Sequence, residues 1–213
     1  MLATGTGIIA VIIGYLLGSI PFAYIAARLV KGVDIRQVGG GNVGTLNVMR
    51  EIGTVAGSAV LLADMGKGAL AVLIAQWLGV STIFVFVVGL AAVLGHSWPV
   101  FLGFMGGRGA ATAIGVLLVL TPVESATCFA IGVTVILFTS NFRLAIGVGL
   151  VLLPVIIWLF GREISLIIYP LTLALFLGLR NVLTLKRELA TMPSKRDLII
   201  DRKFTPWQKR RKQ

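Results

Sequence analysis

The sequence predicts an all-α, polytopic integral membrane protein, a helical bundle in which about seven helices cross the bilayer. Of its 213 residues, 57% are hydrophobic and 13% are charged, and the mean hydropathy is +0.99. Soluble domains are nearer half apolar and a quarter charged, so a water-soluble fold is excluded. The 26 glycines follow no Gly-X-Y period, which excludes collagen. The single cysteine, Cys128, excludes a disulfide framework and a zinc site built on several thiolates.

The expected spans are seven apolar runs, at about 6–29, 54–78, 80–100, 110–121, 123–140, 144–160 and 164–179. Several fall short of the roughly 20 residues that an upright helix needs, so the middle spans are expected to be tilted, broken or half-length. The first run is too long for the apolar core of a signal peptide, and no basic segment precedes it. We therefore expect one transmembrane domain over 1–185 and a basic tail over 186–213.

The distribution of basic residues predicts an outer amino terminus and a cytoplasmic carboxyl terminus. The segment 28–50 carries four basic residues, and 11 more lie within 180–213, where only three side chains are acidic. Loops on the opposite side offer only Arg162. Because basic loops stay in the cytoplasm, this pattern fixes the expected orientation. The tail is expected to face anionic lipid headgroups of the bilayer, and no nucleic-acid partner is expected because no RNA or DNA motif accompanies the charge.

A glycine-rich segment, GGGNVGTLNVMR, occupies residues 39–50 of the first cytoplasmic loop. Gly39, Gly41 and Gly44 leave the backbone free to take positive φ and to turn several N–H groups toward an anion. We interpret the segment as a phosphate cradle, with a plain reverse turn as the alternative. A dinucleotide site is not expected, because no buried strand precedes the glycines.

A second glycine-rich segment, GHSWPVFLGFMGGRGAAT, occupies residues 95–112. Arg108 lies between Gly107 and Gly109, where nothing bulky hinders bidentate pairing with a phosphate. A helix that starts near Gly109 would add its partial positive charge. Alternatively, Arg108 is an interfacial anchor. His96 is the only histidine, so a histidine metal cluster is excluded, and His96 is either a hydrogen-bonding residue at a helix end or an acid–base group.

Polar residues also lie within the expected spans. Asp64 and Lys67, spaced i, i+3, share one helix face and can pair. Ionisable groups at membrane depth are costly, so we expect this pair to face the bundle, either to bind substrate or to lock helices together. Ser19 and Pro21 lie near the inner end of the first run, where Pro21 can kink the helix and free a carbonyl group. A packing kink without chemistry is the alternative there.

In this order, the segments resemble the bacterial acyl-phosphate-dependent glycerol-3-phosphate acyltransferase family, PlsY. The motifs are Gly-Ser-Ile-Pro from Gly18, Gly-x-Gly-Asn-x-Gly from Gly39, Asp-x-x-Lys-Gly from Asp64, and Gly-His-x-x-Pro-Val-Phe from Gly95, followed by Gly-Gly-Arg-Gly from Gly106. The resemblance covers residues 10–112 well and the remainder weakly. It implies a seven-helix enzyme of the bacterial inner (plasma) membrane with its site facing the cytoplasm. Such an enzyme moves a fatty acyl group from acyl-phosphate to the 1-hydroxyl of glycerol 3-phosphate and yields lysophosphatidic acid.

The resemblance also implies the site residues, with no cofactor and no metal. The expected catalytic residues are Asn42, Asn47, His96 and Asn181. The expected substrate-binding residues are Ser19, Gly39, Gly41, Gly44, Arg50, Asp64, Lys67, Gly106, Gly107, Arg108 and Gly109. Acyl-phosphate is a mixed anhydride with a good leaving group, so positioning and electrostatic stabilisation suffice without a covalent intermediate.

Departures from the family pattern leave two alternatives open. Gly40 stands where the family usually has serine, Met105 and Arg108 stand where it has lysines, and the histidine expected just before Asn181 is missing. The first alternative is a paralogue of the same fold with lost or altered catalysis that binds an anionic lipid or phosphate ester. The second is a small anion transporter, which would need polar access from both faces of the membrane.

Overall fold

The computed structural model describes residues 2–189, with side chains at 4–141 and 144–182, and every regular element in this range is a helix. The elements are α1 (Leu2–Ser19), α2 (Phe22–Lys31), η1 (Ile35–Gln37), α3 (Thr45–Glu51), α4 (Thr54–Trp77), α5 (Thr82–Ser97), η2 (Val100–Leu102), α6 (Ala110–Leu120), α7 (Pro122–Thr139), α8 (Phe142–Leu159) and α9 (Ile164–Leu189). The all-α prediction is confirmed. The expected tail boundary at 186 falls inside α9, and the rest of the tail, 190–213, lies outside the described residues.

Within the described residues, five segments are long and apolar enough to cross a membrane: Thr4–Lys31, Thr54–Trp77, Thr82–Leu102, Pro122–Thr139 and Ile164–Val182. Two shorter apolar helices, Ala110–Leu120 and Leu144–Leu159, complete the set. These segments coincide with the apolar runs of the sequence, which confirms the membrane-embedded helical fold. That the two shorter helices also cross the bilayer, and that the amino terminus lies outside, stay predictions.

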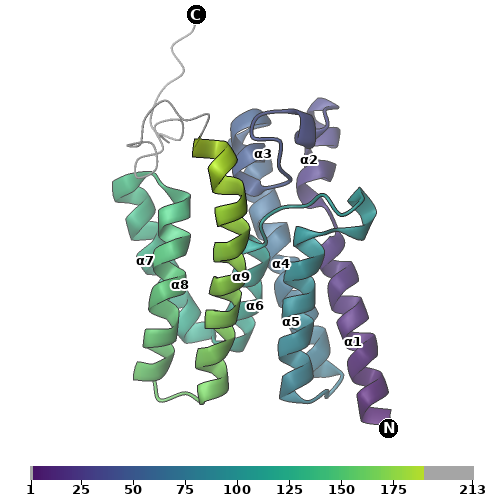
Figure 1. Cartoon of the computed structure of the whole chain (residues 1–213), viewed down its shortest axis with the longest axis vertical. Coiled ribbons are helices and arrows are strands. Elements are labelled where there is room, and N and C mark those ends of the chain that lie inside the picture. The colour runs from purple at the N-terminus through teal and green to yellow at the C-terminus, as the bar shows by residue number, and fades with distance from the viewer. Residues whose placement is uncertain (1, 190–213) are drawn as a thin grey trace, which may run out of the picture. The chain divides into compact units, whose positions relative to one another are not determined.

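The first apolar run forms two helices that are separated at Pro21 (Figure 1). Proline has no N–H group and its ring collides with the preceding turn, so α1 ends at Ser19 and α2 begins at Phe22. The kink expected here is therefore a complete break in the helix. It leaves the carbonyl group of Ile20 outside the regular hydrogen-bond pattern of either helix.

The chain divides into two compact units, Met1–Pro122 and Val123–Gln213, and the first contains the predicted site segments up to Gly109. In this unit α1 and α5 cross at a point where glycines replace side chains. A Cβ added to Gly18 would lie 2.0 Å from the carbonyl oxygen of Ala92, and one added to Gly95 would lie 2.2 Å from that of Tyr15. Such mutual close approach is typical of helix pairs in membranes.

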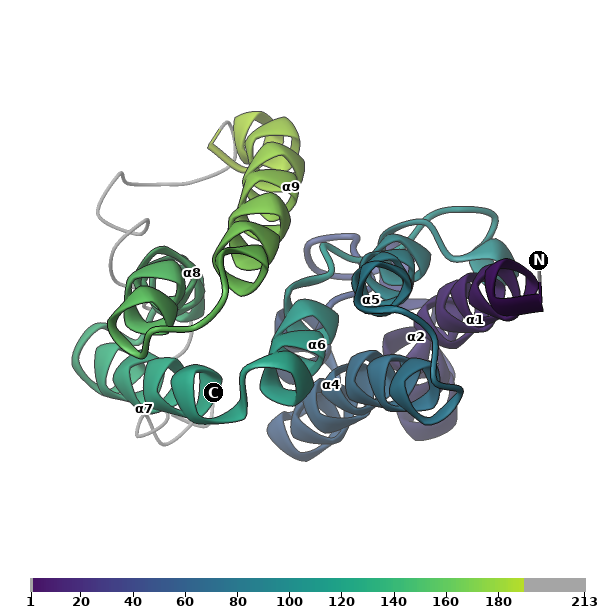
Figure 2. The same cartoon turned by 90° about the horizontal axis from the view of Figure 1, so that it is seen from below.

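The central helix of the first unit is α4, which packs against α1, α2, α3, α5 and α6. Figure 2 shows α4 beside α6, and glycines also allow a close backbone approach where these two helices cross. A Cβ at Gly68 would lie 2.2 Å from the carbonyl oxygen of Thr112, and one at Gly115 would lie 1.9 Å from that of Met65. The backbones therefore touch at Met65 and Gly68, the residues that directly follow Asp64 and Lys67 in α4.

The second unit contains α7 from Val123 onward, together with α8 and α9, and α8 packs against α9. Its most buried charge is Glu124, whose side chain is fully enclosed. Glu124 Oε1 lies 2.5 Å from Nε of Arg162 in the turn between α8 and α9. This pair joins the start of α7 to that turn and was not anticipated from the sequence.

Candidate active site

A pocket lies where the α1–α2 break, the middle of α4, the end of α5 and the second glycine-rich segment meet. It is partly open to solvent, and its free interior is small, with room for about one water molecule. Five of the predicted site residues line it, and Val43 from the first glycine-rich segment joins them. The five are Ser19, Asp64, Lys67, His96 and Gly106. The structure thus brings together segments that are separated by up to about 90 residues in the chain.

Lys67 is the central cation of this pocket, and its side chain is 3% exposed. Its Nζ lies 2.8 Å from Asp64 Oδ1, which confirms the predicted pairing, and donates a 2.8 Å hydrogen bond to the carbonyl oxygen of Ile20. The same Nζ lies 5.7 Å from the centroid of the Phe22 ring. Lys67 therefore ties α4 to the helix break, in addition to neutralising Asp64.

His96 completes a polar group centred on Asp64. Its Nδ1 lies 3.5 Å from Asp64 Oδ1, on the same carboxylate oxygen that Lys67 approaches. The main chain of His96 also holds the second glycine-rich segment, since the N–H of Gly107 donates a 3.1 Å hydrogen bond to the His96 carbonyl oxygen. One buried carboxylate thus links α4, α5 and the segment that follows α5.

Gly107 brings the two glycine-rich segments together. A Cβ at this position would lie 2.2 Å from His96 Nε2 and 2.8 Å from the carbonyl oxygen of Val43. Any side chain would collide with both, so glycine is required for the second segment to pass between the histidine ring and the first segment. The two glycine-rich segments therefore approach each other at this residue, next to the side chain of His96.

Asn47 holds the first glycine-rich segment in shape, and its side chain is buried. Its Oδ1 accepts a 2.9 Å hydrogen bond from the N–H of Gly40. Its Nδ2 donates to the carbonyl oxygens of Ile35, Val38 and Asn42, at 3.1, 3.1 and 3.0 Å. Nδ2 carries two hydrogens, so these three acceptors use its whole donor capacity. The structure gives Asn47 a loop-holding role, and its predicted catalytic role stays a prediction.

Part of the expected phosphate cradle is closed by these contacts. The N–H of Gly40 is bonded to Asn47, and the N–H of Gly41 donates to the Val38 carbonyl oxygen at 3.1 Å. Gly39 has φ +59°, and a Cβ there would lie 2.4 Å from Asn47 Oδ1, so this position requires glycine. The segment is therefore a rigid, internally bonded turn that leads into α3.

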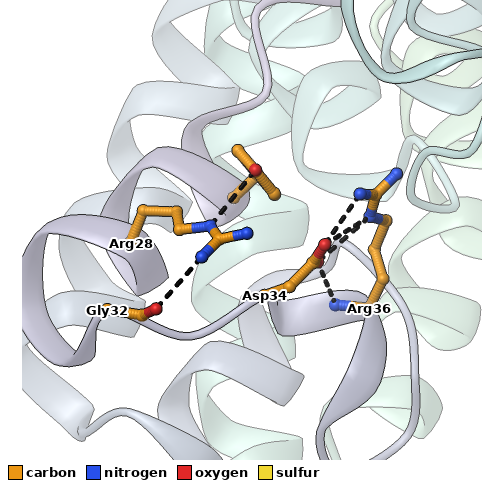
Figure 3. A network of polar contacts seen from close by, with 5 residues as sticks. Arg28, Gly32, Asp34 and Arg36 are labelled. Carbon is orange, nitrogen blue, oxygen red and sulfur yellow. Dashed lines mark hydrogen bonds and ion pairs between the residues drawn. The ribbon is translucent and has the colours of Figure 1, made fainter.

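The chain before this turn is held by a network of arginines (Figure 3). Asp34 accepts a hydrogen bond from the Arg36 N–H at 3.0 Å and pairs with Arg36 Nη2 at 2.7 Å. Arg28 donates to Tyr24 Oη at 3.2 Å and to the Gly32 carbonyl oxygen at 3.1 Å, and both guanidinium carbons lie 5.4 Å from the centroid of the Tyr24 ring. The Arg36 guanidinium lowers the pKa of Asp34 to about 2.

The remaining predicted residues are not among those that line the pocket. Arg50 is exposed on α3, and Arg108 is half-buried immediately before Gly109, the residue that caps the amino terminus of α6. Asn42 is half-buried, and Gly44 caps the amino terminus of α3. Asn181 is exposed on α9, in the second unit.

Sequence reasoning missed two components of the pocket. The first is the Ile20 carbonyl group, which accepts from the Phe22 N–H and from Lys67 Nζ; Pro21 indicated the helix break but not this acceptor. The second is the pair of apolar wall residues Val43 and Pro99. No pattern in the sequence could have identified these two as neighbours, since their contact depends on how the loops fold back.

Comparison with known proteins finds one family over nearly the whole chain. Residues 8–191 match the model of the family described as glycerol-3-phosphate acyltransferase. The chain is 40% identical over 198 residues to glycerol-3-phosphate acyltransferase 1 of Dehalococcoides mccartyi, which covers 90% of this chain and 95% of that protein. It is 38% identical over 183 residues to glycerol-3-phosphate acyltransferase 2 of Moorella thermoacetica, with 86% and 94% covered.

Solved structures show the same likeness. The chain is similar to the crystal structure of PlsY (YgiH), an integral membrane glycerol 3-phosphate acyltransferase, in its glycerol 3-phosphate form. The TM-score is 0.78 at 34% identity, and 87% of this chain and 92% of that chain are covered. The lysophosphatidic acid form of that protein gives a TM-score of 0.77 at 33% identity, with the same coverage.

Proposed function

This chain belongs to the glycerol-3-phosphate acyltransferase family, of the PlsY type, and we propose that it transfers a fatty acyl group from acyl-phosphate to the 1-hydroxyl of glycerol 3-phosphate. The product is lysophosphatidic acid, and the reaction is a step of phospholipid biosynthesis. The observation that carries the proposal is the meeting of both glycine-rich segments at Gly107, beside the pocket that contains Asp64, Lys67 and His96.

The reaction requires one displacement at the acyl carbon. The hydroxyl oxygen of glycerol 3-phosphate attacks the carbonyl carbon of acyl-phosphate, and the bond from that carbon to the phosphate oxygen breaks. Inorganic phosphate leaves and carries away the hydroxyl proton. Because phosphate is a good leaving group, the protein needs to supply only orientation and stabilisation of negative charge, and no covalent intermediate is required.

The cations of the site divide into two groups in this proposal. Lys67 pairs with Asp64 and donates a hydrogen bond to the Ile20 carbonyl oxygen, so it holds the pocket wall in place and adds positive charge to the pocket. Arg50 and Arg108 bind the phosphate groups of the two substrates. Arginine suits this task because its planar fork matches phosphate oxygens in pairs.

The uncharged site residues orient the reacting groups. Ser19 lines the pocket and donates its hydroxyl hydrogen to the Tyr15 carbonyl oxygen at 2.9 Å, which leaves the hydroxyl oxygen as an acceptor. His96 also lines the pocket. Asn47 acts indirectly by holding the first glycine-rich segment, and Asn42 is assigned to contacts with substrate hydroxyl or carbonyl oxygens. The catalytic role expected of Asn181 stays a prediction.

The site is proposed to face the cytoplasm of a bacterial cell from its inner membrane. The basic residues of the segment 28–50 lie between the first and second apolar runs or at the end of the first, Arg108 lies between the third and fourth, and residues from both of these stretches line the pocket. Under the positive-inside rule both stretches lie on the cytoplasmic side, where soluble glycerol 3-phosphate is available. The expected partners are the bilayer and the two substrates.

The test is an acyl-transfer assay with purified full-length protein in nanodiscs. The protein receives palmitoyl-phosphate and radiolabelled glycerol 3-phosphate, and labelled lysophosphatidic acid is separated from the substrate. The proposal predicts product that depends on both substrates. Saturable binding of glycerol 3-phosphate without product would instead favour the alternative of a phosphate-ester-binding paralogue. In that case the variant Gly40→Ser, which restores the serine usual in the family, would be assayed next.

A further inference from the structure

The segment between α5 and α6 presents large apolar side chains outward. Phe101, Phe104 and Met105 are 60%, 58% and 60% exposed, and they lie within five consecutive residues. Large exposed apolar side chains on a transmembrane helix are explained by lipid contact along the span. Phe101 lies in η2, at the very end of the candidate span Thr82–Leu102, and Phe104 and Met105 lie in the turn that follows this span.

The conformation of this segment is imposed by the rest of the first unit. Tyr15 on α1 donates from its hydroxyl group to the Trp98 carbonyl oxygen at 2.8 Å, and Leu102 packs against the buried cluster beneath α2 and α3. Gly103 and Phe104 both adopt left-handed backbone conformations, with φ +60° and +63°. A bulky residue in this region is strained, and such strain persists only where the surroundings impose it.

Both ends of the segment are walls of the pocket. Pro99 lies before the exposed residues and Gly106 follows them directly, and both line the pocket with His96. The exposed side chains therefore lie between two residues that line the pocket. A lipid whose reactive head occupies the pocket must lead its chain out across a neighbouring apolar surface, because burying the chain among the charged groups of α4 would be costly.

We propose that Phe101, Phe104 and Met105 form a lip that contacts the acyl chain of the donor and of the lipid product where that chain leaves the pocket. The lip stabilises long chains and so makes the enzyme prefer them. This inference rests on the proposed function for the identity of the lipid, and it adds the residues that set chain-length preference. Contact of the lip with bulk bilayer lipid alone is the competing explanation.

The test compares the double variant Phe101→Ser/Phe104→Ser with the wild type, in detergent micelles and in nanodiscs. The donors are palmitoyl-phosphate and an octanoyl-phosphate whose chain is too short to cover the lip. We expect the KM for palmitoyl-phosphate to rise about tenfold in both media, which corresponds to about 1.4 kcal/mol of lost contact. The KM for octanoyl-phosphate, the KM for glycerol 3-phosphate and kcat stay within about twofold of the wild-type values. The control, Trp77→Ser, removes an 85% exposed aromatic side chain at the far end of α4 and leaves all four values unchanged.

Three results would overturn the inference: an unchanged KM for palmitoyl-phosphate, an equal rise in KM for both donors, or a rise confined to nanodiscs, which would assign the effect to the bilayer.

A second measurement separates the lip from the proposed function. Wild-type protein is photolabelled with lysophosphatidic acid that carries a diazirine in its acyl chain. Label on residues 98–105 supports the lip even if the transfer assay yields no product, and label confined to other segments contradicts it.

Discussion

Lys67 on α4 is hydrogen-bonded to Ile20, which lies at the break between α1 and α2. Lys67 Nζ donates a 2.8 Å hydrogen bond to the Ile20 carbonyl oxygen. Unpaired backbone acceptors are costly in a membrane, and at this break the Ile20 carbonyl oxygen accepts from the Phe22 N–H at 3.2 Å as well as from Lys67. The same ammonium group pairs with Asp64. One buried cation therefore stabilises both the helix break and the acidic centre of the pocket.

Removing this cation is expected to destabilise the protein strongly. Lys67→Met leaves Asp64 buried without its nearest countercharge and leaves the Ile20 carbonyl oxygen without Nζ as a donor. Breaking a buried ion pair from one side costs about 3–5 kcal/mol. We expect a clear fall in Tm in detergent and loss of acyl transfer. The double variant Asp64→Asn/Lys67→Met, which removes both charges, should recover part of the Tm; a Lys67→Met protein as stable as the wild type would refute this role.

Gly107→Ala is expected to reduce turnover more than stability. The new methyl group would lie 2.2 Å from His96 Nε2 and 2.8 Å from the Val43 carbonyl oxygen, so the two glycine-rich segments must separate. Overpacking of this kind costs about 1–3 kcal/mol, and a displacement of about 1 Å at a catalytic site can cost about a hundredfold in rate. Steady-state kinetics together with Tm checks this. Gly66→Ala is the matched control, since a Cβ there meets nothing within 4 Å; equal activity of both variants would contradict the required close approach.

The crossing of α4 and α6 is expected to tolerate no side chain at Gly115. A Cβ there would lie 1.9 Å from the Met65 carbonyl oxygen, and backbone cannot move aside as a flexible side chain can. We expect Gly115→Ala to lower Tm and to reduce the amount of folded protein recovered after extraction. Gly147→Ala on α8, where a Cβ meets nothing within 4 Å, should behave as the wild type. Comparable Tm values for the two variants would show that the helices are not in backbone contact.

The Asp34–Arg36 pair is expected to make the stability of the protein depend on pH in the acidic range. The pKa of Asp34 is lowered from 3.8 to about 2 in the folded protein, so the carboxylate stabilises the fold above about pH 4. That contribution is lost as pH falls through the folded value near 2. Asp34→Asn keeps a side-chain oxygen that can accept the Arg36 N–H and removes only the charge. The Tm difference between wild type and variant should be present at about pH 6 and vanish toward pH 2; a constant difference would contradict the assignment.

Arg108→Ala is expected to lower kcat/KM for acyl transfer by about a hundredfold or more, the usual effect of removing a donor that stabilises developing negative charge. Arg108→Lys should restore part of the activity, because lysine keeps the charge and loses the paired geometry. Steady-state kinetics with both substrates checks this. If Arg108→Ala transfers acyl groups at the wild-type rate, Arg108 does not contact a phosphate.

Features that depend on local patterns could be predicted from the sequence. The apolar runs predicted the membrane helices, the i, i+3 spacing predicted the ion pair of Asp64 and Lys67, and Pro21 predicted the kink. These follow from helix geometry and from backbone chemistry within one segment. At Pro21 the structure shows a complete break between α1 and α2, where the sequence predicted only a kink.

Features that depend on distant partners could not be predicted. The short helix α3 buries Asn47 and bonds its amide to the chain from Ile35 to Asn42, where the sequence indicated only a glycine-rich turn. Glu124 and Arg162 are separated by 38 residues, and no periodicity relates them. Both arrangements arise when loops fold against helices, and a sequence pattern carries no distance information of that kind.

An experimental structure of the full-length protein with glycerol 3-phosphate bound would test the account most directly. The account predicts phosphate density against the Arg108 guanidinium, with the glycerol hydroxyl groups directed into the pocket between Ser19 and His96. Density for the ligand at a separate site, with the Lys67 pocket closed and Arg108 turned to the lipid, would contradict the proposal that the two glycine-rich segments build one site.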